Sequence, residues 1–274
     1  MGSRIYAACD LEGVAGVVDH GLQCCWDARA GWFAPYLGQA RRLATLELNA
    51  LVEGAIAAGV DEVVAWDGHG GFPGGIDPEL LHPSCRLVMG AGEGGPEGLD
   101  PGFAGLFQTG MHAMAGTPRA VLPHSFHGGL EGYWVDGEPV GEIWMNCYTA
   151  GLQGVPFVFL SGDRAAASEA SKLAPWSVTV AVKEGLGGEP GGLRQAPAVS
   201  MSPAGARQAI REGVERAVHS IGSARPFTPS PPFTVRARFV SPEAADGRET
   251  LPGVRRIDSV TVEACGADRP WILI

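Results

Sequence analysis

The sequence contains no segment that marks the protein as secreted or membrane-bound. Its first residues, Met1 to Tyr6, lead into a short apolar stretch that ends at Asp10, without the long apolar core and cleavage site of a secretory signal. No uninterrupted apolar run approaches the roughly 18 residues that are needed to cross a bilayer. We therefore expect a cytoplasmic protein without a membrane partner.

Positive charge is also scarce. The chain has 20 Lys and Arg against 30 Asp and Glu, which gives a formal net charge of −10. Such a charge opposes binding to the phosphate backbone of nucleic acids and to anionic lipids. Nucleic acid is therefore not an expected partner.

The cysteines form no recognisable binding or disulfide pattern. There are six of them, none in a Cys-x-x-Cys pair, and only Cys24 and Cys25 are adjacent. This spacing suggests neither a thiolate zinc finger nor a disulfide framework. We expect reduced thiols that are mostly buried.

The composition is that of a folded globular protein. The chain has 274 residues, of which 45% are hydrophobic and 18% are charged, so a disordered chain or a coiled coil is not expected. This length can bury a sizeable core without metal or disulfide staples. The 41 glycines and 21 prolines predict many tight turns.

The first 70 residues show the pattern of a βαβ unit. Residues 5–9 form a short apolar run typical of a buried strand, and apolar residues recur with near-helical spacing over 35–58. Residues 63–66 read as the next strand, and a glycine-rich loop follows directly. A βαβ unit favours a parallel sheet that binds ligands at the carboxyl ends of its strands.

The alternation continues less regularly to residue 182. It predicts strands at 104–111, 155–161 and 178–182, with helices at 141–152 and 164–173. A loop rich in glycine and proline follows, and then come a helix at 203–221 and strands at 233–240 and 259–264. We therefore predict an α/β fold with a mainly parallel sheet flanked by helices. Its metal-binding catalytic domain would span residues 1–190, and a smaller C-terminal α+β lobe would span 191–274.

Two carboxylates lie at the end of the first predicted strand. Asp10 and Glu12 are two residues apart, so on an extended backbone both point to the same side, as in a metal-chelating pair. A solvated turn or a helix cap is the alternative. The flanking residues are apolar, however, and buried carboxylates need cations or hydrogen bonds.

Histidines follow other predicted strands. His69 comes after the second strand and His112 after the third, while His124 and His127 lie further along. Imidazole beside carboxylate is a ligand set that suits zinc. For Asp67, which precedes His69, we expect a structural role in the glycine turn. Glu142 begins a predicted helix, where it is either a favourable first-turn glutamate or a metal ligand.

Taken in order, these segments resemble the self-compartmentalising zinc D-aminopeptidases over residues 5 to about 220. No single motif is specific, but the ordered set is. The segments that carry the resemblance are Asp10-Leu11-Glu12-Gly13, Asp67-Gly68-His69, Leu81-His82-Pro83, Gly110-Met111-His112-Ala113, His124-Ser125 and Pro139-Val140-Gly141-Glu142, with Asn146 and Tyr148 to Gly151.

The resemblance implies two zinc ions per subunit. Asp10 would bridge them, Glu12 and His69 would complete one zinc site, and His112 and Glu142 the other. The substrates implied are short peptides with an N-terminal D-residue, such as D-Ala dipeptides. The assembly implied is a ring-shaped homo-oligomer, a decamer in this family.

The resemblance also implies that His124 is catalytic. The family is described as using this histidine as a nucleophile, but zinc chemistry allows a base or a donor to the oxyanion as well. The segment before it, 116–123, is one residue longer than expected, which makes His127 the alternative. The C-terminal segment also departs from the family, because it is broken by proline and lacks the expected amphipathic helix, and C-terminal segments can form subunit contacts.

Two other functions remain open from the sequence. Two-metal exonucleases also begin with a strand that ends in Asp-x-Glu, but the acidic chain and the histidines argue against magnesium-dependent phosphodiester cleavage. A non-catalytic zinc-binding protein is the second alternative.

Overall fold

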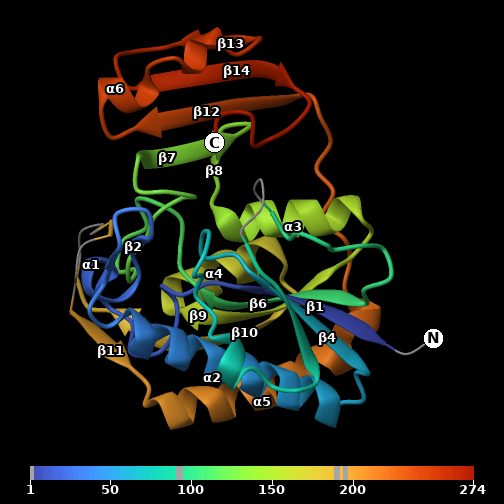
Figure 1. Ribbon diagram of the computed structural model, residues 1–274. Helices are drawn as coiled ribbons and strands as arrows, with labels where there is room; N and C mark the ends of the chain where they lie inside the picture. Colours follow the sequence, from blue (N-terminus) through green and yellow to red (C-terminus); the bar gives the residue numbers. More distant parts are fainter. Residues whose placement is uncertain (1–2, 91–94, 188–191, 194–196) are drawn as a thin grey trace.

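The computed structural model describes residues 3–90, 95–187, 192–193 and 197–274, and its largest element is a seven-stranded sheet (Figure 1). Neighbouring strands pair in parallel except β10 and β11, which are antiparallel. In order across the sheet, the strands are β11 (Ala198–Ser200), β10 (Val178–Gly185), β9 (Phe157–Asp163), β6 (Gly105–Met111), β1 (Arg4–Cys9), β4 (Glu62–Asp67) and β5 (Cys85–Val88).

Helices cover both faces of this sheet. Helices α2 (Leu37–Ala57) and α5 (Pro203–Ser220) pack against each other on one face, and α3 (Glu142–Leu152) and α4 (Arg164–Leu173) lie on the other (Figure 1). Strand β1 therefore contributes to two cores: Ile5 and Ala7 point to one, and Tyr6 and Ala8 to the other. Burial on both faces explains why this strand is apolar without alternation.

A smaller antiparallel sheet packs over α3, at the top of Figure 1. Met145 and Tyr148 of α3 share a core with Phe233 and other side chains of this sheet. Its strands, in order, are β13 (Val254–Arg256), β14 (Thr261–Ala267), β12 (Phe233–Phe239), β7 (Leu130–Val135) and β8 (Glu138–Pro139). Helix α3 thus lies between the two sheets.

Short elements complete the described chain. Helix α1 (His20–Gln23) precedes the two-stranded ribbon of β2 (Trp26–Asp27) and β3 (Trp32–Phe33), and α6 (Pro242–Ala245) follows β12. Three single turns of 3₁₀ helix are Pro78–Leu80, Ile221–Ser223 and Arg248–Thr250. None of the helices within the described residues combines the length and apolar composition of a membrane span.

The structure confirms the predicted α/β fold with a mainly parallel sheet flanked by helices. The predicted boundary at residue 190 lies outside the described residues, and the division into two domains stays a prediction. Elements from before and from after residue 190 contribute to the structure around each of the two sheets. Helix α5 packs on the large sheet although it follows the boundary, whereas β7 and β8 join the smaller sheet although they precede it.

Candidate metal centre

The predicted site residues lie together at the carboxyl edge of the large sheet. β1 lies between β4 and β6, and these three neighbours all run in the same direction. Asp10 and Glu12 follow β1, His69 follows β4 and His112 follows β6. The next strand of the sheet along the chain, β4, pairs with one side of β1, and the later strand β6 pairs with the other side. Parallel sheets commonly bind ligands at the carboxyl ends of the strands where the strand order reverses in this way.

Two glycines allow the ends of β1 and β6 to approach closely. The Gly13 amide donates to the carbonyl of Gly110 over 2.7 Å. A Cβ at Gly13 would lie 2.0 Å from the Met111 carbonyl oxygen, and a Cβ at Gly110, where φ is +72°, would lie 2.0 Å from the Asp10 carbonyl oxygen. Only glycine fits at these positions, and this contact brings Asp10 next to His112.

The two carboxylate oxygens of Asp10 face different histidines. Oδ1 lies 3.0 Å from His69 Nδ1, and Oδ2 lies 3.2 Å from His112 Nε2. Glu12 Oε2 lies 3.0 Å from the same His69 nitrogen, and Glu142 Oε2 lies 3.5 Å from the same His112 nitrogen. Asp10 therefore stands between two groups, one with Glu12 and His69 and one with His112 and Glu142.

Backbone carbonyls fix the orientation of three imidazole rings. His69 Nε2 is 2.7 Å from the Cys24 oxygen, His112 Nδ1 is 3.0 Å from the Ala113 oxygen, and His124 Nδ1 is 3.0 Å from the Leu122 oxygen. A carbonyl only accepts, so each of these nitrogens carries the hydrogen. In the neutral ring, the other nitrogen then presents its lone pair to the carboxylates, which is the usual arrangement of a metal-binding histidine.

The carboxylates are buried without a fixed cation. Asp10 is 7% exposed and Glu12 is 1% exposed. Within the part of the chain that the structure describes, only histidines form ion pairs with Asp10, Glu12 and Glu142. Apart from these ion pairs, both carboxylate oxygens of Glu12 and Nε2 of His112 have no hydrogen-bond partner among these residues. Converging buried oxygens and imidazole nitrogens fit divalent zinc.

The pKa values of Asp10, His69 and His112 are shifted by the interactions between the buried carboxylates and imidazoles. Burial favours the neutral forms, but interactions with His112 and His69 hold the pKa of Asp10 well below its usual value. Burial likewise opposes protonation of His69 and His112, yet the carboxylates raise the pKa of both rings well above the ordinary value. The carboxylates thus favour positive charge on the groups that face them.

His124 also lies at this site, although its segment is longer than expected. Its ring stacks on His112, with centroids 3.8 Å apart, and its Nε2 lies 3.9 Å from Glu142 Oε1. The backbone is left-handed at Leu122 and Phe126, two residues before and two residues after His124. Non-glycine residues in this conformation are strained and concentrate at functional sites. His127 lines the same polar pocket as His124 but does not join the groups of potential ligand atoms among the described residues.

Distances between potential ligand atoms define two groups of three residues within the described chain. His112, His124 and Glu142 offer ligand atoms that all lie within 4.8 Å of one another, and so do Asp10, Glu12 and His112. His69 belongs to neither group, but its Nδ1 lies 3.0 Å from both Asp10 and Glu12, so the structure brings together all six predicted site residues. Their assignment as metal ligands and catalytic residue stays a prediction.

Two further side chains hold the loops of the site. Asp67 accepts hydrogen bonds from the amides of Gly75 and Ile76, at 2.9 and 3.0 Å, which confirms its expected role in the turn. Lys183, on β10, is buried and was not anticipated. Its Nζ donates to the carbonyls of Glu12, Val14 and Val17, so it fixes the loop that carries Glu12.

The sequence also gave no signal for His20. Its Nε2 lies 3.7 Å from Glu12 Oε1, and burial lowers its pKa. It belongs to the four-residue helix α1, in a part of the chain where no element was predicted. Only the fold brings this ring to the carboxylates.

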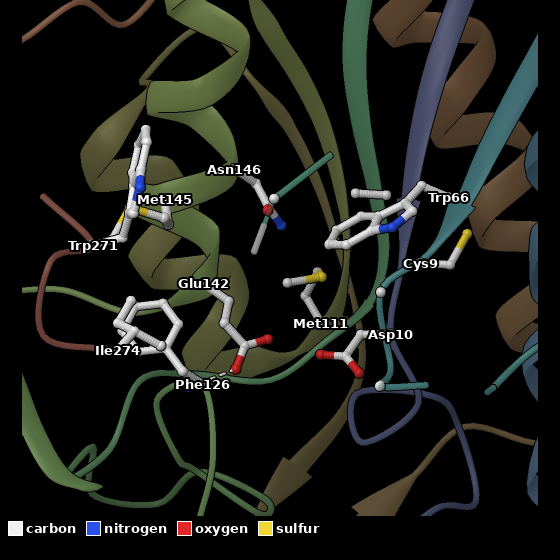
Figure 2. Close-up of a pocket in the computed structure, with 14 residues that line it drawn as sticks. Cys9, Asp10, Trp66, Met111, Phe126, Glu142, Met145, Asn146, Trp271 and Ile274 are labelled. Atoms are coloured by element: carbon white, nitrogen blue, oxygen red, sulfur yellow. Dashed lines mark hydrogen bonds between the residues drawn. The ribbon is translucent and has the colours of Figure 1, made fainter. Parts of the chain in front are cut away.

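Two pockets adjoin the carboxylates of Asp10 and Glu142. The apolar pocket, shown in Figure 2, has a volume of about 340 Å³ and lies between Trp66 and the side chains of α3 and the C-terminal segment. The polar pocket has a volume of about 370 Å³ and is lined by His20, His124 and His127 among others. Asp10 and Glu142 line both pockets, and Glu12, His69 and His124 line the polar one as well, so the candidate metal centre opens into the polar pocket and adjoins the apolar one.

Comparisons with known proteins agree with this geometry. A family model described as peptidase M55, D-aminopeptidase, matches residues 3–270. A D-aminopeptidase of Bacillus subtilis strain 168 is 30% identical over 254 residues, which cover 91% of this chain and 86% of the relative. A solved structure, described as the Zn-dependent D-aminopeptidase DppA from Bacillus subtilis, a self-compartmentalizing protease, matches with a TM-score of 0.84 and 29% identity. It covers 98% of this chain and 93% of that one.

Proposed function

The chain belongs to the peptidase M55 family of D-aminopeptidases, and from this premise we propose that it is a zinc-dependent aminopeptidase acting on short peptides with an N-terminal D-residue. D-Ala dipeptides are among the proposed substrates. The Zn-dependent relative supports zinc as the metal. The observation that carries the proposal is the pair of buried groups on either side of Asp10, each with an imidazole nitrogen facing carboxylate oxygens.

We assign one zinc to Asp10, Glu12 and His69, and a second to Asp10, His112 and Glu142. The shared aspartate follows from its two oxygens, which face different histidines. His69 Nε2 and His112 Nδ1 each donate a hydrogen bond to a backbone carbonyl. His69 Nδ1 and His112 Nε2, which face the carboxylates, are therefore available to bind metal. Zinc held by these residues would polarise the scissile carbonyl and lower the pKa of a water towards neutrality.

The protein's own residues place the peptide. Among the three carboxylates, the Glu142 side chain is the most accessible, at 23% exposed against 6% for Asp10 and 1% for Glu12. Its Oε1 already accepts the Phe126 amide hydrogen over 2.8 Å, which fixes its orientation. We propose that Oε1 also holds the free α-amine that an aminopeptidase must recognise, while Oε2, which faces His112, serves the second zinc.

His124 is proposed as the residue that moves a proton during hydrolysis. Its Nδ1 hydrogen is donated to the Leu122 carbonyl, so Nε2 is free to accept a proton on the side of Glu142. A residue in this position serves as a base for the attacking group and then as an acid for the leaving amine. Attack by His124 itself, as a nucleophile, would instead leave a covalent acyl adduct that mass spectrometry detects.

The two alternative functions receive less support. The family match gives no support to a magnesium-dependent exonuclease, and the histidines are softer ligands than magnesium prefers. A non-catalytic zinc site is typically closed, whereas this cluster adjoins two pockets.

The proposal extends to assembly and location. The self-compartmentalizing relative supports a ring-shaped homo-oligomer, and we propose the decamer of this family. Native mass spectrometry that shows only monomer at micromolar concentration would contradict the ring. The six free cysteines support a cytoplasmic, reducing environment.

The experiment that tests the function compares D-Ala-D-Ala with L-Ala-L-Ala. The protein is stripped of metal and reloaded with zinc, and amino-acid release is measured before and after. Zinc-dependent release from the D-peptide alone is expected. Release from the L-peptide would keep the metallopeptidase but discard the stereochemistry, and release from neither peptide, with zinc bound, would favour the non-catalytic alternative.

A further inference from the structure

We infer that the apolar pocket receives the side chain of the N-terminal D-residue and selects large apolar or aromatic side chains over alanine. This inference rests on the proposed function and names its preferred substrates. The carboxylates of Asp10 and Glu142 lie at one end of the pocket, and the remainder of its wall is mainly apolar (Figure 2).

Two sides of the pocket are formed by distant parts of the chain. Trp66 comes from the end of β4, and Met111 from the end of β6. On the opposite side, Met145 of α3 lies beside Trp271, which belongs to the C-terminal segment (Figure 2). Two indole rings and two thioethers form a surface suited to aromatic and branched apolar groups.

The volume of the pocket decides the size of its occupant. It measures about 340 Å³, whereas a dry protein cavity of about 150 Å³ is enough to bind benzene. The methyl group of alanine would leave most of the pocket to water. A phenylalanine or leucine side chain would displace that water and bury apolar surface, which favours such substrates by about tenfold to hundredfold.

The charges decide which part of the peptide enters. Among the described residues that line the apolar pocket, only Asp10 and Glu142 have charged side chains, and none is basic. The C-terminal carboxylate of a dipeptide therefore finds no counter-charge there. The α-amine, by contrast, meets the Glu142 carboxylate at this end of the pocket, and the side chain of the same residue extends into the pocket.

The polar pocket fits the other half of the peptide. It adjoins the apolar pocket at Asp10, Phe126 and Glu142, and it carries the imidazoles of His20, His124 and His127. Imidazoles donate hydrogen bonds to carbonyl and carboxylate oxygens. A peptide that spans the two pockets would therefore place its scissile bond at the candidate metal centre.

The test measures kcat/KM of the zinc-loaded enzyme for D-Phe-D-Ala, D-Leu-D-Ala and D-Ala-D-Ala. We expect D-Phe-D-Ala and D-Leu-D-Ala to exceed D-Ala-D-Ala by about tenfold or more. Binding of free D-phenylalanine and D-alanine to the same protein, measured by calorimetry, gives a readout that does not depend on turnover. D-phenylalanine should bind more tightly by a similar factor.

Two variants alter the pocket in opposite ways. Met145→Trp fills it, and Trp271→Ala removes one wall, so both should reduce the preference for D-Phe-D-Ala over D-Ala-D-Ala by about fivefold or more. The control is Trp32→Ala, because Trp32 lies on β3, is 48% exposed and lines neither pocket. Its preference should equal that of the wild type.

The outcomes separate this inference from the proposed function. If D-Ala-D-Ala is hydrolysed with zinc at least as well as D-Phe-D-Ala, the side-chain preference is wrong while the aminopeptidase stands. If no D-peptide is hydrolysed, the proposed function is contradicted. In that case equal binding of the two amino acids would also overturn the pocket assignment, and tighter binding of D-phenylalanine would retain it.

Discussion

The loop that carries Glu12 depends on a single buried ammonium group. Lys183 is 3% exposed, and its Nζ donates to the carbonyls of Glu12, Val14 and Val17. Replacing Lys183 with methionine keeps most of the side-chain volume and removes all three donors. We predict that this variant is less stable and binds zinc more weakly, because the loop is no longer held.

The expected loss of unfolding free energy depends on which hydrogen bonds remain to each of the three carbonyls. The Val14 oxygen also accepts from the amide of Val17, so it keeps one partner. The carbonyls of Glu12 and Val17 accept no other backbone hydrogen bond within the described residues. Two unsatisfied buried carbonyls at about 1–3 kcal/mol each reduce the free energy of unfolding by roughly 2–6 kcal/mol. That is a large fraction of the total stability of a typical protein.

The assay is urea unfolding of the metal-free proteins, followed by zinc titration. Only one other lysine occurs in the sequence, Lys172, which is exposed in the last turn of α4. Lys172→Met is therefore the matched control, and its free energy of unfolding should stay within about 0.5 kcal/mol of the wild type. Equal unfolding midpoints and equal zinc affinities for the two variants would refute the role given to Lys183.

Three further predictions concern the site and its surroundings. Asp10→Ala should lose both zinc ions and all activity, and a fully zinc-loaded, active variant would refute the bridging role. His124→Ala should keep its zinc and lose turnover; unchanged turnover would transfer the role to His127. Burial raises the pKa of Glu169 to about 7. Between pH 4.5 and 7 the folded state therefore holds a proton that the unfolded state releases, so the free energy of unfolding falls as the pH rises from about 4.5 to 7. Glu169→Gln should therefore be more stable than the wild type at pH 8 by up to about 3 kcal/mol, with no difference at pH 4, and parallel pH profiles in urea unfolding would contradict this.

Local patterns in the sequence were enough to predict the large sheet and the residues at its edge. The apolar runs of β1 and β4 and the period of α2 are visible over a few residues, because each depends on burial of the segment itself. Strands that end at the same edge then bring Asp10, His69 and His112 together. The role of Glu142 could not be decided from local patterns, because a first-turn glutamate and a metal ligand look alike in a sequence.

The parts that were not predicted depend on contacts between distant segments. The segment of β7 pairs with β12, about 100 residues later, and neither its length nor its burial pattern is distinctive. Trp271 reaches the apolar pocket only because the C-terminal segment folds back over α3. Lys183 and His20 meet the Glu12 loop from elements that carry no metal-binding motif. Each of these contacts results from the fold and leaves no local pattern.

The central claim is that two zinc ions share Asp10 between two defined ligand groups. The most direct test is a crystal structure of the zinc-loaded protein, with data collected on both sides of the zinc absorption edge. Our account predicts two anomalous peaks per subunit, one in contact with Glu12 and His69, one in contact with His112 and Glu142, and both in contact with Asp10. A single peak, or zinc bound away from Asp10, would contradict it.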